Sequence, residues 1–360
     1  MGELKLMKGN EAFAEAAIRA GVDAYFGYPI TPQSEVLEYF MAEKPHERTG
    51  MVVLQAESEV AAINMVYGAA STGKKAMTSS SSPGVSLKME GISYMAGAEL
   101  PGLILNVVRG GPGLGTIQPS QADYFQATKG GGHGDYRLIV LAPSSVQEMF
   151  DFVRLSFELT FKYRNPVMML ADGVIGQMME KIQLSDPIPR RTDAELIKEC
   201  PWATTGKPKT RERNIITSLN LQSAVQEQHN IHLQDKYRKI EDAEVRFEKF
   251  QCDDAEYLFV AYGSSARIAQ KSVQEARAKG IKAGLFRPIT LFPFPKKEIA
   301  ALAKQVKGML AVEMSAGQLV EDVRLAVNGK VPVEHYGRMG GMVHSPEEVL
   351  EALEKRFIGG

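Results

Sequence analysis

The feature that most constrains the fold of this chain is a regular alternation between short apolar segments and segments with helical periodicity. Residues 22–28 form a short apolar run, and the segment before it carries Phe13, Ala16, Ala17 and Ala20 at helical spacing. Alternating strands and helices predict a parallel sheet that helices cover on both faces. The expected strands are 22–28, 51–54, 75–78, 103–108, 138–141 and 167–171, and the expected helices are 10–20, 31–43, 57–71, 85–98 and 144–162.

The alternation stops near residue 184 and resumes at residue 257. Several prolines between these points indicate an extended connector, and a charged helix is expected over roughly 219–250, with Ile231, Tyr237, Ile240, Val245 and Phe247 as one apolar stripe. Strands are expected again at 257–262, 281–286, 309–313 and 331–336, and helices at 263–280 and 346–356. A length of 360 residues fits two cores better than one. We therefore expect an α/β fold with two doubly wound parallel-sheet domains, 1–185 and 255–360, joined by a connector with an interface helix, 186–254.

Charge and cysteine content exclude several classes of protein. The formal net charge is −1, so no basic field favours nucleic acid, and charged residues interrupt every apolar stretch before it reaches the length of a membrane helix. We expect a cytoplasmic protein with no nucleic acid or membrane partner. The two cysteines, Cys200 and Cys252, lie far apart and are too few for an all-cysteine iron–sulfur cluster. We expect free thiols and no metal site.

Polar residues follow three of the expected strands at their carboxyl ends, where ligands bind to open parallel sheets. Thr31 and Pro32 are typical of a helix start, so Thr31 either caps that helix or helps to bind an anionic group there. Glu59 begins the next helix, and Arg109 follows the strand 103–108. Each residue alone has an ordinary structural explanation, but together the three could converge on one crevice.

Two other motifs are weaker. The segment 68–75 nearly matches a phosphate-binding loop, but it lacks the Ser or Thr that holds magnesium and follows a helix instead of a strand. A helix end followed by solvated lysines is the better interpretation. His133 lies in a glycine-rich loop where a structural role is more common than a catalytic one, and His229 and His232 lack a carboxylate at metal-binding spacing.

Six motifs, taken in order, resemble those of the α subunit of the 2-oxoacid:ferredoxin oxidoreductases. They are Tyr28-Pro-Ile-Thr-Pro32, Glu57-Ser-Glu59, Ser79-Ser-Ser-Ser-Pro-Gly84, Arg109-Gly-Gly-Pro-Gly113, Gly130-Gly-Gly-His-Gly-Asp135 and Arg287-Pro-Ile-Thr-Leu-Phe-Pro-Phe-Pro295. The resemblance extends over nearly the whole chain. It implies that the first domain is a pyrimidine-binding domain of a thiamine diphosphate enzyme and that the second is of the transketolase C-terminal type.

The same resemblance implies a role for each matching residue. Glu59 matches the glutamate that bonds the aminopyrimidine ring and favours its reactive imino tautomer. Thr31 and Arg109 match residues that hold the carboxylate and carbonyl of the 2-oxoacid, for which a planar guanidinium is well suited. Ile30, Ser82 and Pro83 are expected to contact the cofactor.

Two of the family's features are missing from this chain, namely its Gly-Asp-Gly diphosphate motif and its cluster-binding cysteines. The resemblance therefore implies a β subunit that supplies the diphosphate and magnesium sites. Iron–sulfur clusters are expected on the β subunit and on a ferredoxin-like δ subunit, and coenzyme A on a γ-type subunit. Ferredoxin is the expected electron acceptor.

The loop after Arg109 bears on the choice of oxoacid. No Lys or Arg occurs between Arg109 and Lys129, so a second substrate carboxylate would have no local cation. The loop resembles that of the branched-chain type, which acts on 2-oxoisovalerate and yields acyl-coenzyme A, carbon dioxide and reduced ferredoxin. The alternatives are the same reaction on 2-oxoglutarate, a non-redox thiamine decarboxylase and a non-catalytic assembly paralogue.

Overall fold

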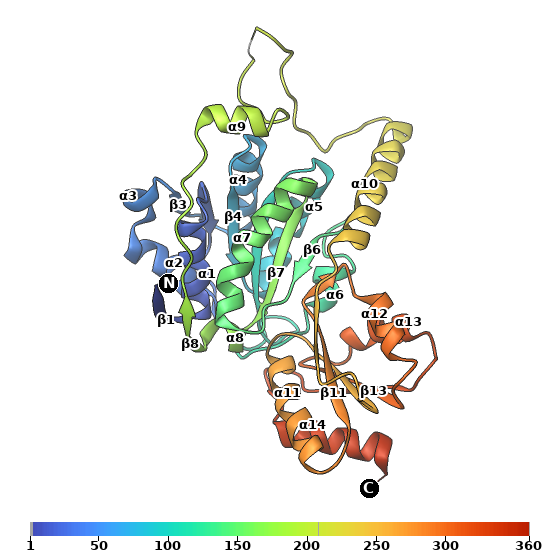
Figure 1. Cartoon of the computed structure of the whole chain (residues 1–360). Coiled ribbons are helices and arrows are strands. Elements are labelled where there is room, and N and C mark those ends of the chain that lie inside the picture. Colours follow the sequence, from blue (N-terminus) through green and yellow to red (C-terminus); the bar gives the residue numbers. More distant parts are fainter. Residues whose placement is uncertain (1–2, 208, 360) are drawn as a thin grey trace.

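The computed structural model describes residues 3–207 and 209–359, so Met1, Gly2, Pro208 and Gly360, which the expected domains and connector include, lie outside it. The larger sheet has the strand order β12-β6-β7-β5-β4-β2-β3, and all its pairs are parallel except β12 with β6 (Figure 1). Its strands are β2 (Ala24–Gly27), β3 (Val52–Gln55), β4 (Ala76–Ser80), β5 (Gly102–Val108), β6 (Ile139–Leu141), β7 (Pro166–Asp172) and β12 (Thr290–Phe292). Every residue of β4, β5 and β7 is buried, as expected for strands covered on both faces.

Helices cover this sheet in two groups, one formed by α1, α2 and α7 and the other by α4 and α5. The helices are α1 (Gly9–Arg19), α2 (Ser34–Glu43), α3 (Pro45–Thr49), α4 (Glu59–Ser71), α5 (Ser82–Gly97), α6 (Tyr124–Thr128), α7 (Val146–Tyr163) and α8 (Gly173–Gln177). A two-stranded antiparallel sheet, β1 (Leu4–Lys8) with β8 (Met179–Gln183), flanks them. This small sheet was not predicted, because one short pair of strands has no alternation with helices to mark it.

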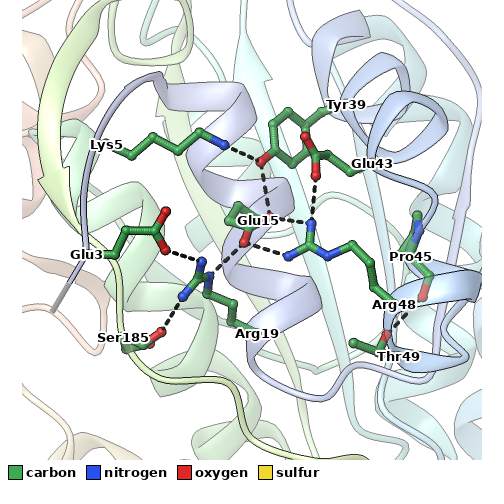
Figure 2. A network of polar contacts seen from close by, with 10 residues as sticks. All are labelled: Glu3, Lys5, Glu15, Arg19, Tyr39, Glu43, Pro45, Arg48, Thr49 and Ser185. Atoms are coloured by element: carbon green, nitrogen blue, oxygen red, sulfur yellow. Dashed lines mark hydrogen bonds and ion pairs between the residues drawn. The ribbon is translucent and has the colours of Figure 1, made fainter.

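An ionic network fixes α1 against α2 and α3 (Figure 2). Glu15 is 2% exposed, and its carboxylate accepts hydrogen bonds from Arg19 at 2.7 Å, from both Nη atoms of Arg48 at 2.8 and 2.9 Å, and from the Tyr39 hydroxyl at 3.1 Å. Burial opposes ionisation of Glu15, but the bonds from Arg48 and Arg19 outweigh it and lower the pKa of this carboxyl group.

The second sheet has the order β14-β13-β10-β11-β9 and is parallel except for the edge strand β9. Its strands are β9 (Phe247–Phe250), β10 (Tyr257–Val260), β11 (Ala283–Pro288), β13 (Gly308–Glu313) and β14 (Val333–Gly337). The accompanying helices are α11 (Gly263–Ala278), α12 (Lys296–Leu302), α13 (Leu319–Val327) and α14 (Pro346–Leu353), and a π-helical turn follows over Glu354–Ile358. The expected α/β class with two doubly wound sheets is confirmed.

The connector contains α9 (Asp193–Glu199) and α10 (Ser223–Ala243), and an extended segment between them stands away from the body of the molecule (Figure 1). The prediction of one helix over 219–250 is wrong at its end, because residues 247–250 form β9 against β11. Ile231 is 48% exposed, so it is not part of the buried stripe, which Leu233, Tyr237 and Ile240 form instead. The domain limits at 185 and 255 stay a prediction.

Strand β12 and a buried glutamine join the two halves of the chain. Although β12 follows β11 in sequence, it pairs with β6 of the larger sheet. Gln121 is 1% exposed; its main-chain N–H donates to Met314 O at 2.9 Å, and its side-chain amide donates to Tyr262 O at 2.9 Å. The same side chain accepts hydrogen bonds from Ser265 Oγ at 2.7 Å and from the Met314 N–H at 3.0 Å. In the described residues no helix is both long and apolar enough to cross a membrane.

Candidate functional site

One cavity of about 720 Å³ lies where the carboxyl ends of strands from both sheets meet. Ser82 follows β4 and Arg109 follows β5, while Met314 follows β13 and Met339 follows β14; all four residues line the cavity. The carboxyl ends of parallel strands are the usual place for ligands, and the volume is in the range of small-molecule sites. A hollow of about 830 Å³ beside α10 contains none of the predicted site residues.

Arg109 ties two loops at this edge of the sheet together. Its side chain is buried, and its guanidinium donates from Nη1 to Thr31 O at 3.0 Å and from Nη2 to Leu114 O at 3.1 Å. Its Nε is also buried and has no partner among the described residues. Buried donors are nearly always hydrogen-bonded in native structures, so this unpaired Nε marks Arg109 as a candidate ligand contact.

The prediction that Thr31 caps a helix is wrong. Helix α2 begins at Ser34, and the residues before it form a turn in which the Gln33 N–H donates to Ile30 O at 3.0 Å. The Gln33 side chain is buried and accepts a hydrogen bond from Ser79 Oγ at 2.5 Å, so a contact with β4 holds the residue that directly precedes the helix. Thr31 is therefore exposed and meets Arg109 through its main-chain carbonyl, not at the end of a helix.

Glu59 lies against the first turn of α5. Ser58 caps α4 by accepting a hydrogen bond from the Ala61 N–H at 3.1 Å, and Glu59 is the first residue of that helix, 6% exposed. Its carboxylate packs against Gly84, where a Cβ atom would lie 2.6 Å from Glu59 Oε1 and 2.2 Å from Ser80 Oγ. A glycine is required at position 84 for this close approach.

The buried polar groups around Glu59 fit a ligand that both donates and accepts hydrogen bonds. The hydroxyl oxygens of Ser80 and Ser81 are buried without a partner, and in the described residues no hydrogen bond reaches the Glu59 carboxylate. Lys88 is buried nearby; burial lowers its pKa to about 8, against the opposing effect of the Glu59 charge. An aminopyrimidine ring, with its ring nitrogens and exocyclic amino group, has matching chemistry.

A chain of hydrogen bonds fixes the position of Ser82 relative to Arg109. Ser82 Oγ accepts from the Arg109 N–H at 3.1 Å, and the Ser82 N–H donates to Asn106 Oδ1 at 3.1 Å. Asn106 Nδ2 in turn donates to Asp123 Oδ2 at 2.9 Å. Burial raises the pKa of Asp123, although hydrogen bonds from Ser82 and Asn106 oppose the shift. Neither Asn106 nor Asp123 was predicted as a site residue; for Asn106 the available signal was a lone polar residue within the apolar run 103–108.

The structure brings some of the predicted site residues together and separates others. Ser82, Pro83 and Arg109 share the cavity wall, whereas Ile30, Thr31 and Glu59 are not part of the lining. Thr31 is connected to these residues by the hydrogen bond from Arg109 to its main-chain carbonyl. Glu59 is connected to them by its contact with Gly84, in the same helical turn as Ser82. The assigned roles of these six residues remain predictions.

The residues of the weaker motifs, in the segment 68–75 and at His229, contact other parts of the protein. Gly73 follows the end of α4 with a φ of +80°, which supports the helix-end interpretation. The lysines after it are not fully solvated, because Lys75 is partly buried and donates from its N–H to Asp23 Oδ2 at 2.8 Å and from Nζ to Ala20 O at 2.9 Å. His229 Nε2 lies 2.7 Å from Gly97 O. Cys200 and Cys252 are both buried and free.

Two family models match the chain. Residues 15–249 match "Pyruvate flavodoxin/ferredoxin oxidoreductase, thiamine diP-bdg", and residues 255–349 match "Pyruvate:ferredoxin oxidoreductase core domain II". Among solved structures, a 2-oxoglutarate:ferredoxin oxidoreductase from Magnetococcus marinus, with 2-oxoglutarate, coenzyme A and succinyl-CoA bound, superposes with a TM-score of 0.84 at 28% identity, covering 98% of this chain and 65% of that one. A split-gene transketolase with a TM-score of 0.60 and 13% identity, covering 97% of each chain, shares the fold.

Sequence relatives cover almost the entire chain. The ketoisovalerate oxidoreductase subunit VorB of Methanothermobacter thermautotrophicus is 51% identical over 98% of this chain and 97% of its own length. The 2-oxoglutarate synthase subunit KorA of Methanothermobacter marburgensis is 36% identical over 98% of this chain and 99% of its own length. Because both the family models and these relatives span the chain, it belongs to the 2-oxoacid:ferredoxin oxidoreductase family as an α-type subunit with a thiamine-diphosphate-binding region.

Proposed function

We propose that this chain acts in a complex that oxidatively decarboxylates a branched-chain 2-oxoacid, 2-oxoisovalerate, to acyl-coenzyme A and carbon dioxide with reduction of ferredoxin. The observation that carries the proposal is the difference in identity, 51% to the ketoisovalerate oxidoreductase subunit against 36% to the 2-oxoglutarate synthase subunit, at equal coverage of this chain. The loop after Arg109, which has no Lys or Arg before Lys129, supports the same choice.

In this proposal the chain provides the pyrimidine side of the cofactor site. When bound, thiamine diphosphate would supply a carbon nucleophile and an electron sink for the oxoacid. The Glu59 carboxylate holds a proton shared with the pyrimidine ring, and its burial beside Gly84 supports that role. Ile30, Ser82 and Pro83 contact the cofactor.

Thr31 and Arg109 hold the oxoacid. The unpartnered Nε of Arg109, next to two Nη atoms already fixed on main-chain carbonyls, offers a donor whose orientation is set before the substrate arrives. Such a rigid cation binds a carboxylate at little entropic cost. The exposed Thr31 hydroxyl adds a second donor from the neighbouring loop.

The remaining parts of the reaction belong to partner subunits. The chain has two cysteines, fewer than the four thiolates of an ordinary cluster, and lacks the Gly-Asp-Gly motif for diphosphate and magnesium. A β subunit would bind the diphosphate and metal, the β subunit and a ferredoxin-like δ subunit would carry the clusters, and a γ-type subunit would bind coenzyme A. A cytoplasmic location fits this set of partners.

The test uses the complex co-expressed with its partner subunits under anaerobic conditions. Reduction of ferredoxin or methyl viologen is compared for 2-oxoisovalerate, 2-oxoglutarate and pyruvate, each with coenzyme A. We expect the highest kcat/KM for 2-oxoisovalerate. Glu59→Gln should lower kcat by about 10²- to 10⁴-fold, the usual contribution of a positioned acid–base group, whereas Glu57→Gln, a matched change at an exposed neighbour, should have little effect.

A second candidate is the same reaction on 2-oxoglutarate, which the structural likeness to the Magnetococcus marinus enzyme favours. A higher kcat/KM for 2-oxoglutarate would establish it and reject the branched-chain proposal. Full activity of the Glu59→Gln complex would instead indicate a non-catalytic paralogue. Activity without any iron–sulfur partner would indicate a non-redox decarboxylase.

A further inference from the structure

The cavity at Arg109 has an unusual distribution of charge. Among its lining residues only Arg109 and Asp123 are ionisable, and both come from the first domain. The facing wall comes from the second domain, where Met314, Ala316 and Met339 provide apolar contact area. Methionine side chains are flexible and adapt to aliphatic groups of different shape.

The residues that present Met339 are held close to the Arg109 loop. A Cβ atom at Gly110 would lie 2.9 Å from the Gly341 N atom and 3.0 Å from the Gly340 carbonyl carbon, and one at Gly341 would lie 2.5 Å from the Gln118 Cβ. Glycines on both sides thus let two loops from different domains touch through their main chains. Met339 is 61% exposed, lies next to this contact in sequence and lines the cavity.

Asp123, which also lines the cavity, is held in place by a hydrogen bond. Its carboxylate accepts the hydrogen bond from Asn106 Nδ2 at 2.9 Å, within the chain that also positions Ser82 and Arg109. A carboxylate held in a partly buried cavity repels a second anion more strongly than one in open water, because the local dielectric constant is lower. An interface that must reject a competitor often uses such a repulsive element together with an attractive one.

We propose that Met339 of the second domain and the carboxylate of Asp123 are specificity-determining residues, which admit an aliphatic oxoacid side chain and exclude a second carboxylate. The inference rests on the proposed function, in which Arg109 binds the first carboxylate of the substrate. It gives the second domain a direct part in substrate choice. It also explains how one cation in the cavity suffices: a monocarboxylic oxoacid leaves no further charge to neutralise.

The test measures kcat/KM for 2-oxoglutarate divided by kcat/KM for 2-oxoisovalerate in the assembled complex. Met339→Lys places a cation in the wall and should raise this ratio about tenfold, equivalent to about 1.4 kcal/mol. Met339→Glu should change the ratio in the opposite direction. Asp123→Asn removes the repelling charge, keeps an acceptor for Asn106, and should also raise the ratio.

Met342→Lys is the matched control, since Met342 is 53% exposed, lies three residues further along the same loop and is not part of the cavity lining. It should leave the ratio at the wild-type value. Three results would overturn the inference: an unchanged ratio in both Met339→Lys and Asp123→Asn, the same change with Met339→Glu as with Met339→Lys, or an equal effect of Met342→Lys. The substrate preference of the wild-type complex tests the proposed function separately. If the wild type prefers 2-oxoisovalerate, any of these three results rejects only the inference about Met339 and Asp123. A wild-type complex that prefers 2-oxoglutarate would reject both.

Discussion

The substitution Arg109→Lys tests whether this site needs only a positive charge or also the hydrogen-bonding geometry of the guanidinium. The guanidinium bridges two loops by donating to Thr31 O at 3.0 Å and to Leu114 O at 3.1 Å. A lysine keeps the charge but has one nitrogen, so it cannot reach both carbonyls and also present a fixed donor to the substrate. Losing one charge-assisted hydrogen bond costs about 1.5–3 kcal/mol. If that loss falls on the bound transition state, kcat/KM for the oxoacid should fall by about 10- to 150-fold.

The assay is anaerobic viologen reduction by the assembled complex, with kcat and KM determined separately and the thermal midpoint measured alongside. Arg154→Lys on α7 serves as control, because its side chain is 59% exposed and pairs only with Glu158 among the described residues. It should match the wild type. If Arg109→Lys retained kcat/KM within about threefold, positive charge alone would suffice at this position, and the argument from bridging geometry would be refuted.

Two further predictions concern packing and acid stability. Gly84→Ala should reduce kcat at least as severely as Glu59→Gln, because its Cβ would lie 2.6 Å from Glu59 Oε1 and 2.2 Å from Ser80 Oγ; unchanged activity in the same viologen assay would contradict this placement of Glu59. Glu15→Gln should destabilise the first domain by about 1–3 kcal/mol at pH 7, since Arg19 and Arg48 lose their buried carboxylate partner and keep only the more exposed Glu3 and Glu43. Because the pKa of Glu15 is lowered on folding, its contribution is present above about pH 4.3 and is lost as the pH falls through the folded-state value. The difference in thermal midpoint between the variant and the wild type should therefore shrink on acidification, and a constant difference would refute the ionic explanation.

The local sequence pattern was sufficient to predict a strand or helix wherever burial of the element's own residues decides its secondary structure. The strand expected at 103–108 is β5, Gly102–Val108, and all its residues are buried, so a continuous apolar run was an adequate signal. The helix expected at 57–71 is α4, with Ser58 as its cap. The placing of Glu59 and Arg109 just after strand ends followed from the same alternation, and the motif resemblance led to the correct family.

The failures occurred where contacts distant in sequence decided the local structure. Thr31-Pro32 has the residue types of a helix start, but the helix begins at Ser34, and the preceding Gln33 is hydrogen-bonded to Ser79 of β4. Residues 247–250 follow a charged helix, yet pairing with β11 makes them a strand. In both cases the local propensity is weak compared with a hydrogen bond made to a residue far along the chain.

The sequence by itself determined the central strands of both sheets and the long helices beside them, and which polar residues stand at the carboxyl ends of those strands, because these depend on the periodicity of neighbouring side chains. Only the tertiary structure decided that the loop carrying Met339 lies against the loop after Arg109, and that Asn106 connects Ser82 with Asp123. Asn106 makes its contacts beside one sheet, whereas the Met339 loop meets the Arg109 loop where the two sheets pack together. No periodicity within a segment records the distant partner that it will meet.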